Sequence, residues 1–112
     1  MISLNEPYLS GKEKIFVNDT LKKNWISNFG KYNKRFETSL SKLTKSKNVI
    51  AVSSGTAALH LALRAMGVKQ HSEVIVPSLT FVASVNVIKY LNAYPVFMDV
   101  KEDHNLDIKK TI

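Results

Sequence analysis

The stretch VIAVSSGTAALHLAL, from Val49 to Leu63, changes character in its middle. A β-branched run ends at two serines, a glycine and a threonine, and a run rich in alanine and leucine follows. The first run is typical of a buried strand and the second of a helix. The junction between them therefore needs small polar residues for one of two reasons.

The first explanation of Ser53–Thr56 is a helix cap, and the second is a phosphate site. A serine before a helix accepts a hydrogen bond from a free N–H of the first turn. Such free N–H groups, a glycine that admits close approach and the positive end of the helix dipole also suit a phosphate. Neither G-x-x-x-x-G-K-[ST] nor G-x-G-x-x-G occurs, so known nucleotide loops are excluded. These four residues alone favour the cap.

The sequence after residue 47 predicts strands that alternate with helices. We expect strands at 48–52, 73–77 and 95–100, with helices at 56–66 and 81–91. Gly67 and Asn92 follow the two helices and tolerate the left-handed conformation that ends them. The order β-α-β-α-β predicts a mainly parallel sheet with right-handed crossovers. Ligands of such sheets bind at the carboxyl ends of strands, which brings together Ser53–Thr56, Ser78–Phe81 and Asp99.

The first 47 residues predict two amphipathic helices. Ser10 and Glu13 have capping-box spacing, which predicts a helix that begins near Gly11. WISNFG (25–30) is typical of a loop with an aromatic anchor, and apolar residues then recur at helical spacing, at Tyr32, Phe36, Leu40 and Leu43. We therefore expect two parts, residues 1–47 and residues 48–112. The last residues predict a new helix with Asp107 as its N-cap, as in the front piece of a longer protein.

Composition excludes several classes of protein. The net charge of +7 comes mostly from lysines of residues 1–50, and a lysine-rich solvated surface explains it better than nucleic-acid binding. Cysteine is absent, and no apolar run approaches the roughly 20 residues of a membrane span. The N-terminus does not resemble a signal peptide, so we expect a cytoplasmic protein. His60, His71 and His104 lack metal-ligand spacing, and no metal is expected.

Three blocks of the sequence carry a family resemblance: SSGTAALHLAL (53–63), EVIVPSLTFVASVNVI (73–88) and YPVFMDV (94–100). Together they resemble the N-terminal third of the DegT/DnrJ/EryC1/StrS family. The start of the chain is also similar to the start of that family, in NEPYLSG (5–11) and NWISNFGKYNKRFE (24–37). The resemblance therefore covers nearly the whole chain. Its members are pyridoxal-phosphate-dependent aminotransferases of nucleotide-linked keto-sugars. The resemblance therefore implies the α/β large domain of fold type I, the aspartate-aminotransferase architecture.

The resemblance also assigns roles to residues of the predicted rim. It implies that Ser54, Gly55 and Thr56 hold the cofactor phosphate through N–H and hydroxyl groups. It implies that Phe81 stacks on the pyridine ring, whereas this residue taken alone is better explained as part of the core. With both blocks on one rim, the phosphate site becomes the favoured explanation of the glycine loop.

Trp25 and Asn28 lie in the loop that, by the same resemblance, lines the substrate entrance. Members of the family are more than three times as long as this chain. The Schiff-base lysine and the aspartate that pairs with the ring nitrogen lie beyond residue 112. We therefore expect a truncated large domain without catalytic residues, inactive by itself. The first strand, at 48–52, is expected to lack its usual partner because that partner comes from later in the chain.

The whole enzyme is expected to move an amino group, from glutamate, to a nucleotide-linked keto-deoxy sugar for surface glycans. The start of the chain and VFMDVKEDHNLDI (96–108) look most like the branch that acts on UDP-linked 4-keto-6-deoxy-N-acetyl sugars. The resemblance implies a homodimer. Two alternatives stay open: a sugar dehydratase with histidine at the missing lysine position, and a non-catalytic phosphate-binding α/β module.

Overall fold

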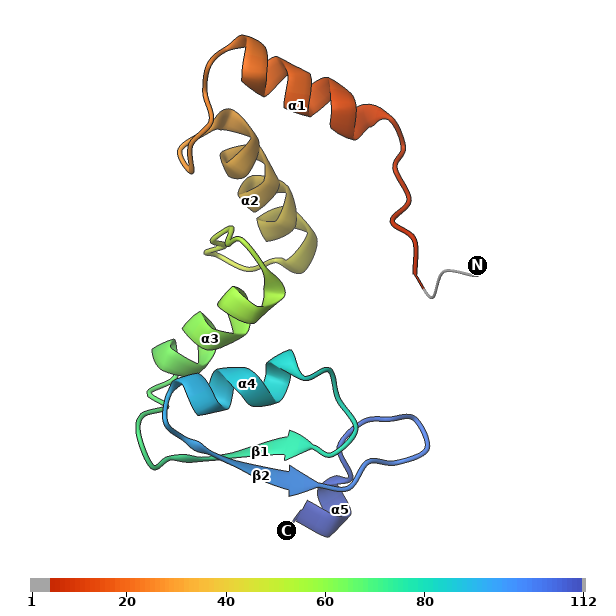
Figure 1. The fold of residues 1–112 in the computed structure, drawn as a ribbon, viewed down its shortest axis with the longest axis vertical. Coiled ribbons are helices and arrows are strands. Elements are labelled where there is room, and N and C mark those ends of the chain that lie inside the picture. The colour runs from red at the N-terminus through yellow and green to blue at the C-terminus, as the bar shows by residue number, and fades with distance from the viewer. Residues whose placement is uncertain (1–4, 112) are drawn as a thin grey trace. The chain divides into compact units, whose positions relative to one another are not determined.

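The computed structural model describes residues 5–111 of the chain. The chain divides into two compact units, Met1–Ala51 and Val52–Ile112. The first unit contains two helices, and the second contains α3, β1, α4, β2 and α5 in that order (Figure 1). Within the described part of the chain, no helix is long and apolar enough to cross a membrane.

Two helices joined by a loop form the first unit. Helix α1 spans Lys12–Lys22 and α2 spans Lys31–Thr44, which confirms both predicted helices. The Ser10 hydroxyl donates to the Glu13 carboxylate at 2.9 Å, so these side chains pair with each other at the start of α1. Between the helices, the rings of Phe16 and Tyr32 have centroids 5.2 Å apart.

The apolar face of α2 forms as predicted, but the described part of unit 1 covers only part of it, with Tyr32 and Leu40 half-buried. Phe36 is 55% exposed and Leu43 is 81% exposed. No described residue of this unit is buried. The half-buried residues of unit 1 lie in two places, where α1, the loop and α2 meet and where residues 49–51 return to α2 beside Glu37 and Leu40.

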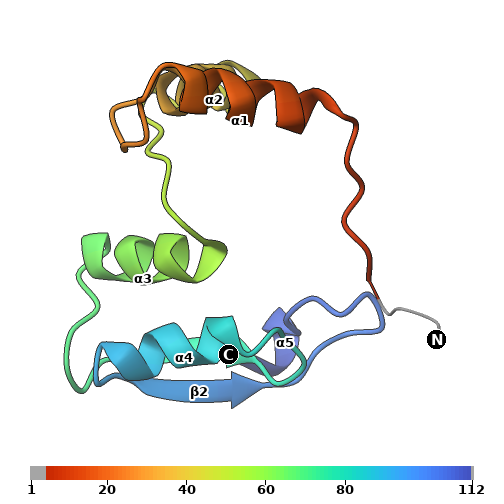
Figure 2. The same cartoon turned by 45° about the horizontal axis from the view of Figure 1, so that its top comes forward.

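Unit 2 is a two-stranded parallel sheet with helices on it. Strand β1 (Glu73–Pro77) pairs with β2 (Tyr94–Met98), from Glu73 opposite Tyr94 to Pro77 opposite Met98. Helix α4 (Ala83–Tyr90) connects the strands and packs on them, and α3 (Gly55–Ala65) packs against α4. Figure 2 shows α4 lying along the sheet with α3 beyond it. The short helix α5 (Ile108–Thr111) follows, capped by the Asp107 carboxylate as predicted.

The core of unit 2 is small and lies between α4 and the sheet. Five of the described residues are buried: Val76, Ala83, Val87, Ile88 and Ala93. Val87 and Ile88 are 1% exposed, whereas Ile75 and Phe97 on the strands are 49% and 54% exposed. The sheet is therefore covered well only where α4 lies on it.

Both helices that precede strands end as the sequence predicts. Gly67 has φ 87° and Asn92 has φ 54°, so each adopts the left-handed conformation. After α3, the Val68 N–H donates to the Leu63 carbonyl at 3.0 Å, and after α4 the Ala93 N–H donates to the Ile88 carbonyl at 3.1 Å. These bonds satisfy helix carbonyls that would otherwise lack partners.

The strand predicted at 48–52 is wrong for this chain, because no strand forms there. A parallel strand is held by hydrogen bonds to its neighbours, and β1 pairs with β2 alone in the described part of the chain. Ile50 is 80% exposed, and the Ala51 N–H donates to the Glu37 carboxylate at 2.9 Å. In the described part of the chain, residues 48–52 pair with neither β1 nor β2. Smaller differences concern α4, which begins at Ala83, and β2, which ends at Met98.

Candidate functional site

The glycine loop forms the beginning of α3. Ser54 is the N-cap residue in an extended conformation, and its hydroxyl oxygen accepts the Ala57 N–H at 3.1 Å. The Ser54 carbonyl accepts the Ala58 N–H at 3.0 Å. The helix-cap explanation of these residues is therefore confirmed as geometry.

The cap leaves other donors available at the same helix end. Among the described residues, the N–H groups of Gly55 and Thr56 have no hydrogen-bond partner. A Cβ atom added at Gly55 would meet nothing within 4 Å, so the space in front of the backbone is open. The Ser54 hydroxyl hydrogen remains available because the cap uses only its oxygen. The donor set and the open approach fit a phosphate.

Phe81 lies just before α4 and is 78% exposed, so its ring is not part of the core. Helices α3 and α4 run in the same direction, and both begin on the side to which the strand arrowheads point (Figures 1 and 2). Ser54–Thr56 and Phe81 thus lie on the side of unit 2 where the strands end. This is the arrangement expected from the predicted sheet.

Asp99 also lies at this side, directly after β2. The Ser78 N–H donates to the Met98 carbonyl at 2.8 Å, which continues the strand pairing to this point. The Asp99 carboxylate forms an ion pair with Lys110 of α5 at 3.0 Å, and it raises the pKa of Lys110 above its usual value. Asp99 is thus linked to α5 by an exposed ion pair.

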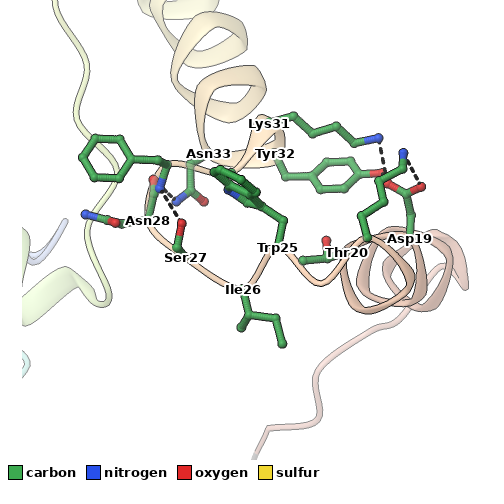
Figure 3. A pocket seen from close by; sticks show the side chains of 12 residues that line it. Asp19, Thr20, Trp25, Ile26, Ser27, Asn28, Lys31, Tyr32 and Asn33 are labelled. Carbon is green, nitrogen blue, oxygen red and sulfur yellow. Dashed lines mark hydrogen bonds and ion pairs between the residues drawn. The ribbon is translucent and has the colours of Figure 1, made fainter.

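Trp25 and Asn28 lie in unit 1, in the loop between α1 and α2 (Figure 3). This loop lines a cavity of about 770 Å³ together with the end of α1 and the start of α2. The Asn33 side chain donates to the Asn28 carbonyl at 2.7 Å. The cavity has the size of a typical small-molecule site, about 300–1,000 Å³.

Sequence reasoning missed an ionic cluster beside this cavity. The Asp19 carboxylate accepts Lys23 at 2.8 Å, Lys31 at 2.7 Å and the Tyr32 hydroxyl at 2.8 Å. These hydrogen bonds, that of Lys23 first, hold the pKa of Asp19 well below its usual range. Asp19 in turn raises the pKa values of Lys31 and Tyr32. Only the Asp19–Lys23 spacing of four was visible in the sequence.

The histidines do not form a metal site in the described part of the chain. His60 on α3 makes an edge-to-face contact with Tyr90 on α4, with ring centroids 6.1 Å apart.

Comparisons with known proteins connect this geometry to a class of enzyme. The chain is 48% identical over 101 residues to GDP-perosamine synthase of Vibrio cholerae, covering 90% of this chain and 28% of that protein. It is 43% identical over 110 residues to GDP-perosamine synthase of Caulobacter vibrioides, covering 97% and 30%. It also superposes on the PLP form of a solved structure from Streptococcus pneumoniae, described as a sugar aminotransferase, with a TM-score of 0.88. That match has 36% identity and covers 98% of this chain and 28% of that one.

The likeness assigns the fold to the pyridoxal-phosphate-dependent transferases of fold type I, in agreement with the expected architecture. The sequence pattern of the DegT/DnrJ/EryC1/StrS aminotransferase family matches residues 7–111. The chain belongs to that family. It spans less than a third of the length of the relatives described above. The family and the PLP form of its neighbour indicate pyridoxal phosphate as the cofactor.

Proposed function

We propose that this chain is the N-terminal part of an aminotransferase that moves an amino group from glutamate to the carbonyl of a nucleotide-linked keto-sugar. Pyridoxal phosphate supplies the electron sink for this chemistry when it is bound. In the proposal the whole enzyme is a cytoplasmic homodimer that serves surface-glycan synthesis. The sequence favours a UDP-linked sugar, whereas the first relatives are named for a GDP-linked product.

The observation that carries the proposal is the pair of free N–H groups at the start of α3. Gly55 and Thr56 would donate these groups to the cofactor phosphate, and the hydroxyls of Ser54 and Thr56 would add donors. The open space at Gly55 supports this role because a phosphate oxygen can reach the backbone there. The exposed ring of Phe81 on the same side of the sheet would stack on the pyridine ring.

The proposed substrate side lies in unit 1. Trp25 and Asn28 would line the substrate entrance, as residues of the loop beside the cavity. No group of this chain is proposed to act as acid or base in the reaction. The chain would bind and orient the cofactor, and the later part of the protein would supply the lysine.

The test uses a chimaera in which this chain replaces the matching segment of GDP-perosamine synthase of Vibrio cholerae. Gly55→Val and Phe81→Ala should each raise the dissociation constant of pyridoxal phosphate at least about tenfold, which corresponds to about 1.4 kcal/mol. Equilibrium dialysis and visible absorbance measure this constant, and amination of the GDP-linked keto-sugar measures activity. The side chain added at Gly55 enters open space, so the fold itself should tolerate it.

Ser53→Ala is the matched control, because the Ser53 side chain neither caps α3 nor belongs to the proposed donor set. It should leave cofactor affinity unchanged. Normal affinity in both Gly55→Val and Phe81→Ala would contradict the proposed cofactor site.

A further inference from the structure

The groups proposed to hold the cofactor lie at the starts of two different helices of unit 2. The free N–H groups of Gly55 and Thr56 belong to α3, whereas Phe81 lies just before α4. The two helices run in the same direction, so their relative position along that direction sets the spacing between these groups (Figure 2). A slip of α3 by the rise of one residue, about 1.5 Å, would move the phosphate donors by that amount relative to Phe81.

Helix α3 is attached to the rest of unit 2 mainly through α4. Of the helices and strands that the structure describes, α4 makes the most extensive contact with α3. Residues 48–52 form no strand, so the chain before α3 does not tie the start of this helix to the sheet. At the other end of α3, Leu63 and Val68 pack against the core cluster. The position of the start of α3 therefore depends on its contact with α4.

Most of this contact is apolar and has no preferred direction. One face of α3 is half-buried, at Ala57, His60 and Leu63, which recur at spacings of three. Among the described residues, no hydrogen bond or ion pair joins α3 to α4. Burial of alanine and leucine stabilises the contact but does not by itself prevent a small slip, because the hydrophobic effect is non-directional.

The rings of His60 and Tyr90 supply a directional contact between the two helices. Their centroids are 6.1 Å apart and their planes meet at 79°, which is an edge-to-face arrangement. Such pairs prefer a defined geometry because the positive edge of one ring faces the negative face of the other. Tyr90 is 60% exposed, so its ring is not needed to fill the core.

We propose that His60 and Tyr90 are positioning residues, whose ring contact fixes α3 against α4 and thereby sets the spacing between the phosphate donors and Phe81. His60 follows Gly55 by five residues, about 7.5 Å along the helix, so it would act through the helix and not by touching the cofactor. The inference deepens the proposed function and rests on it for the identity of the ligand. It gives a role in ligand binding to two side chains that lie outside the proposed donor set.

The first test removes each ring and then restores it, in the chimaera described above. His60→Leu and Tyr90→Leu should each raise the dissociation constant of pyridoxal phosphate at least about threefold. His60→Phe and Tyr90→Phe keep a ring in place and should stay within about twofold of the original value. The double leucine variant should bind no more weakly than the weaker single variant, because both remove the same contact. Leu61→Ala, at an exposed position on α3, is the control and should have no effect.

Inorganic phosphate distinguishes positioning from damage to α3. A phosphate ion requires only the donors of α3, so His60→Leu should leave its affinity for the apo chimaera unchanged. At saturating pyridoxal phosphate, His60→Leu should also change the visible circular dichroism, because the cofactor ring is oriented differently. An equal loss of affinity for phosphate and for pyridoxal phosphate would overturn the inference, since His60 would then only support α3.

A second test follows the two helices without any cofactor. The chain contains no cysteine, so spin labels can be attached through Ala58→Cys on α3 and Lys89→Cys on α4, both at exposed positions. In the 112-residue chain, electron paramagnetic resonance measures the distribution of distances between the labels. His60→Leu should broaden or shift this distribution, and His60→Phe should preserve it. An unchanged distribution in His60→Leu would show that the ring contact does not fix the helices.

Failure of this inference can be told apart from failure of the proposed function. If Gly55→Val and Phe81→Ala weaken cofactor binding while His60→Leu does not, the cofactor site stands and the positioning role is wrong. If Gly55→Val and Phe81→Ala bind the cofactor normally while the label distances respond to His60→Leu, the ring contact fixes the helices and the proposed cofactor site is wrong.

Discussion

Gly67 and Asn92 show at single residues how unit 2 is shaped. Both have positive φ and both precede the turn into a strand. Gly67→Ala should lower the free energy of unfolding of unit 2 by about 1–2 kcal/mol, because a side chain in the left-handed conformation is strained there. Urea denaturation followed by circular dichroism measures the loss. Asn92→Gly is the control and should be close to neutral, because glycine adopts this conformation freely.

Asp19 gives unit 1 a dependence on pH. Its pKa is lower in the folded chain than in the unfolded chain, so its contribution is complete above the unfolded value of about 4. That contribution is lost as the pH falls below 4 toward the folded value. Asp19→Asn should therefore lower the melting temperature at pH 7 and leave little further loss between pH 5 and pH 2.

The measurement is thermal melting of the tryptophan fluorescence, since Trp25 lies in the loop next to Asp19. Glu102→Gln, an exposed carboxylate of unit 2, serves as the control. An Asp19→Asn chain that melts like the original chain at pH 7 would show that the cluster does not stabilise unit 1.

Residues whose role depends on near neighbours could be predicted from the sequence. Ser54 as N-cap of α3 and Gly67 as its stop needed only local patterns. The Asp19 cluster could not be predicted in full, because Lys31 and Tyr32 reach Asp19 only after α1 and α2 turn toward each other. The roles of Phe81 and Trp25 as ligand contacts remain predictions.

Among the elements, α4 holds unit 2 together. Ile88 is 1% exposed and belongs to the core cluster with Val76 and Ala93. Ile88→Ala should destabilise unit 2 by about 2–5 kcal/mol, through lost burial and the cavity left behind. With so few buried residues, such a loss should unfold unit 2, and amide hydrogen exchange of β1 and β2 should show it. Leu61→Ala, at a residue that is 52% exposed, should cost far less.

The elements that were predicted well are those that find their partners nearby. Strand β1 has the predicted bounds, and β2 lies beside it in parallel as expected. The segment 48–52 has the composition of a strand but does not form one, because composition cannot supply a neighbour. A pattern therefore predicts a strand only together with the rest of its sheet.

Exposed apolar side chains and free strand edges predict that the chain associates with itself. Each strand of the sheet has one neighbour in the described chain, so each presents an unpaired edge. Ile75 of β1 is 49% exposed beside such an edge. Sedimentation should give an average mass that rises with concentration, and Ile75→Lys should reduce the rise. A mass that stays at 12.6 kDa at every concentration would contradict this prediction.

The core of unit 2 is also unusually local. Every residue of its main cluster, and every residue packed against it, falls within residues 63–93. Contacts between residues so near in sequence cost little loop-closure entropy and form rapidly. During synthesis, at roughly 5–20 residues per second, this core could form within seconds of its last residue leaving the ribosome. The start of α3 would then be shaped early, and later segments of a longer chain would assemble on a surface that is already folded.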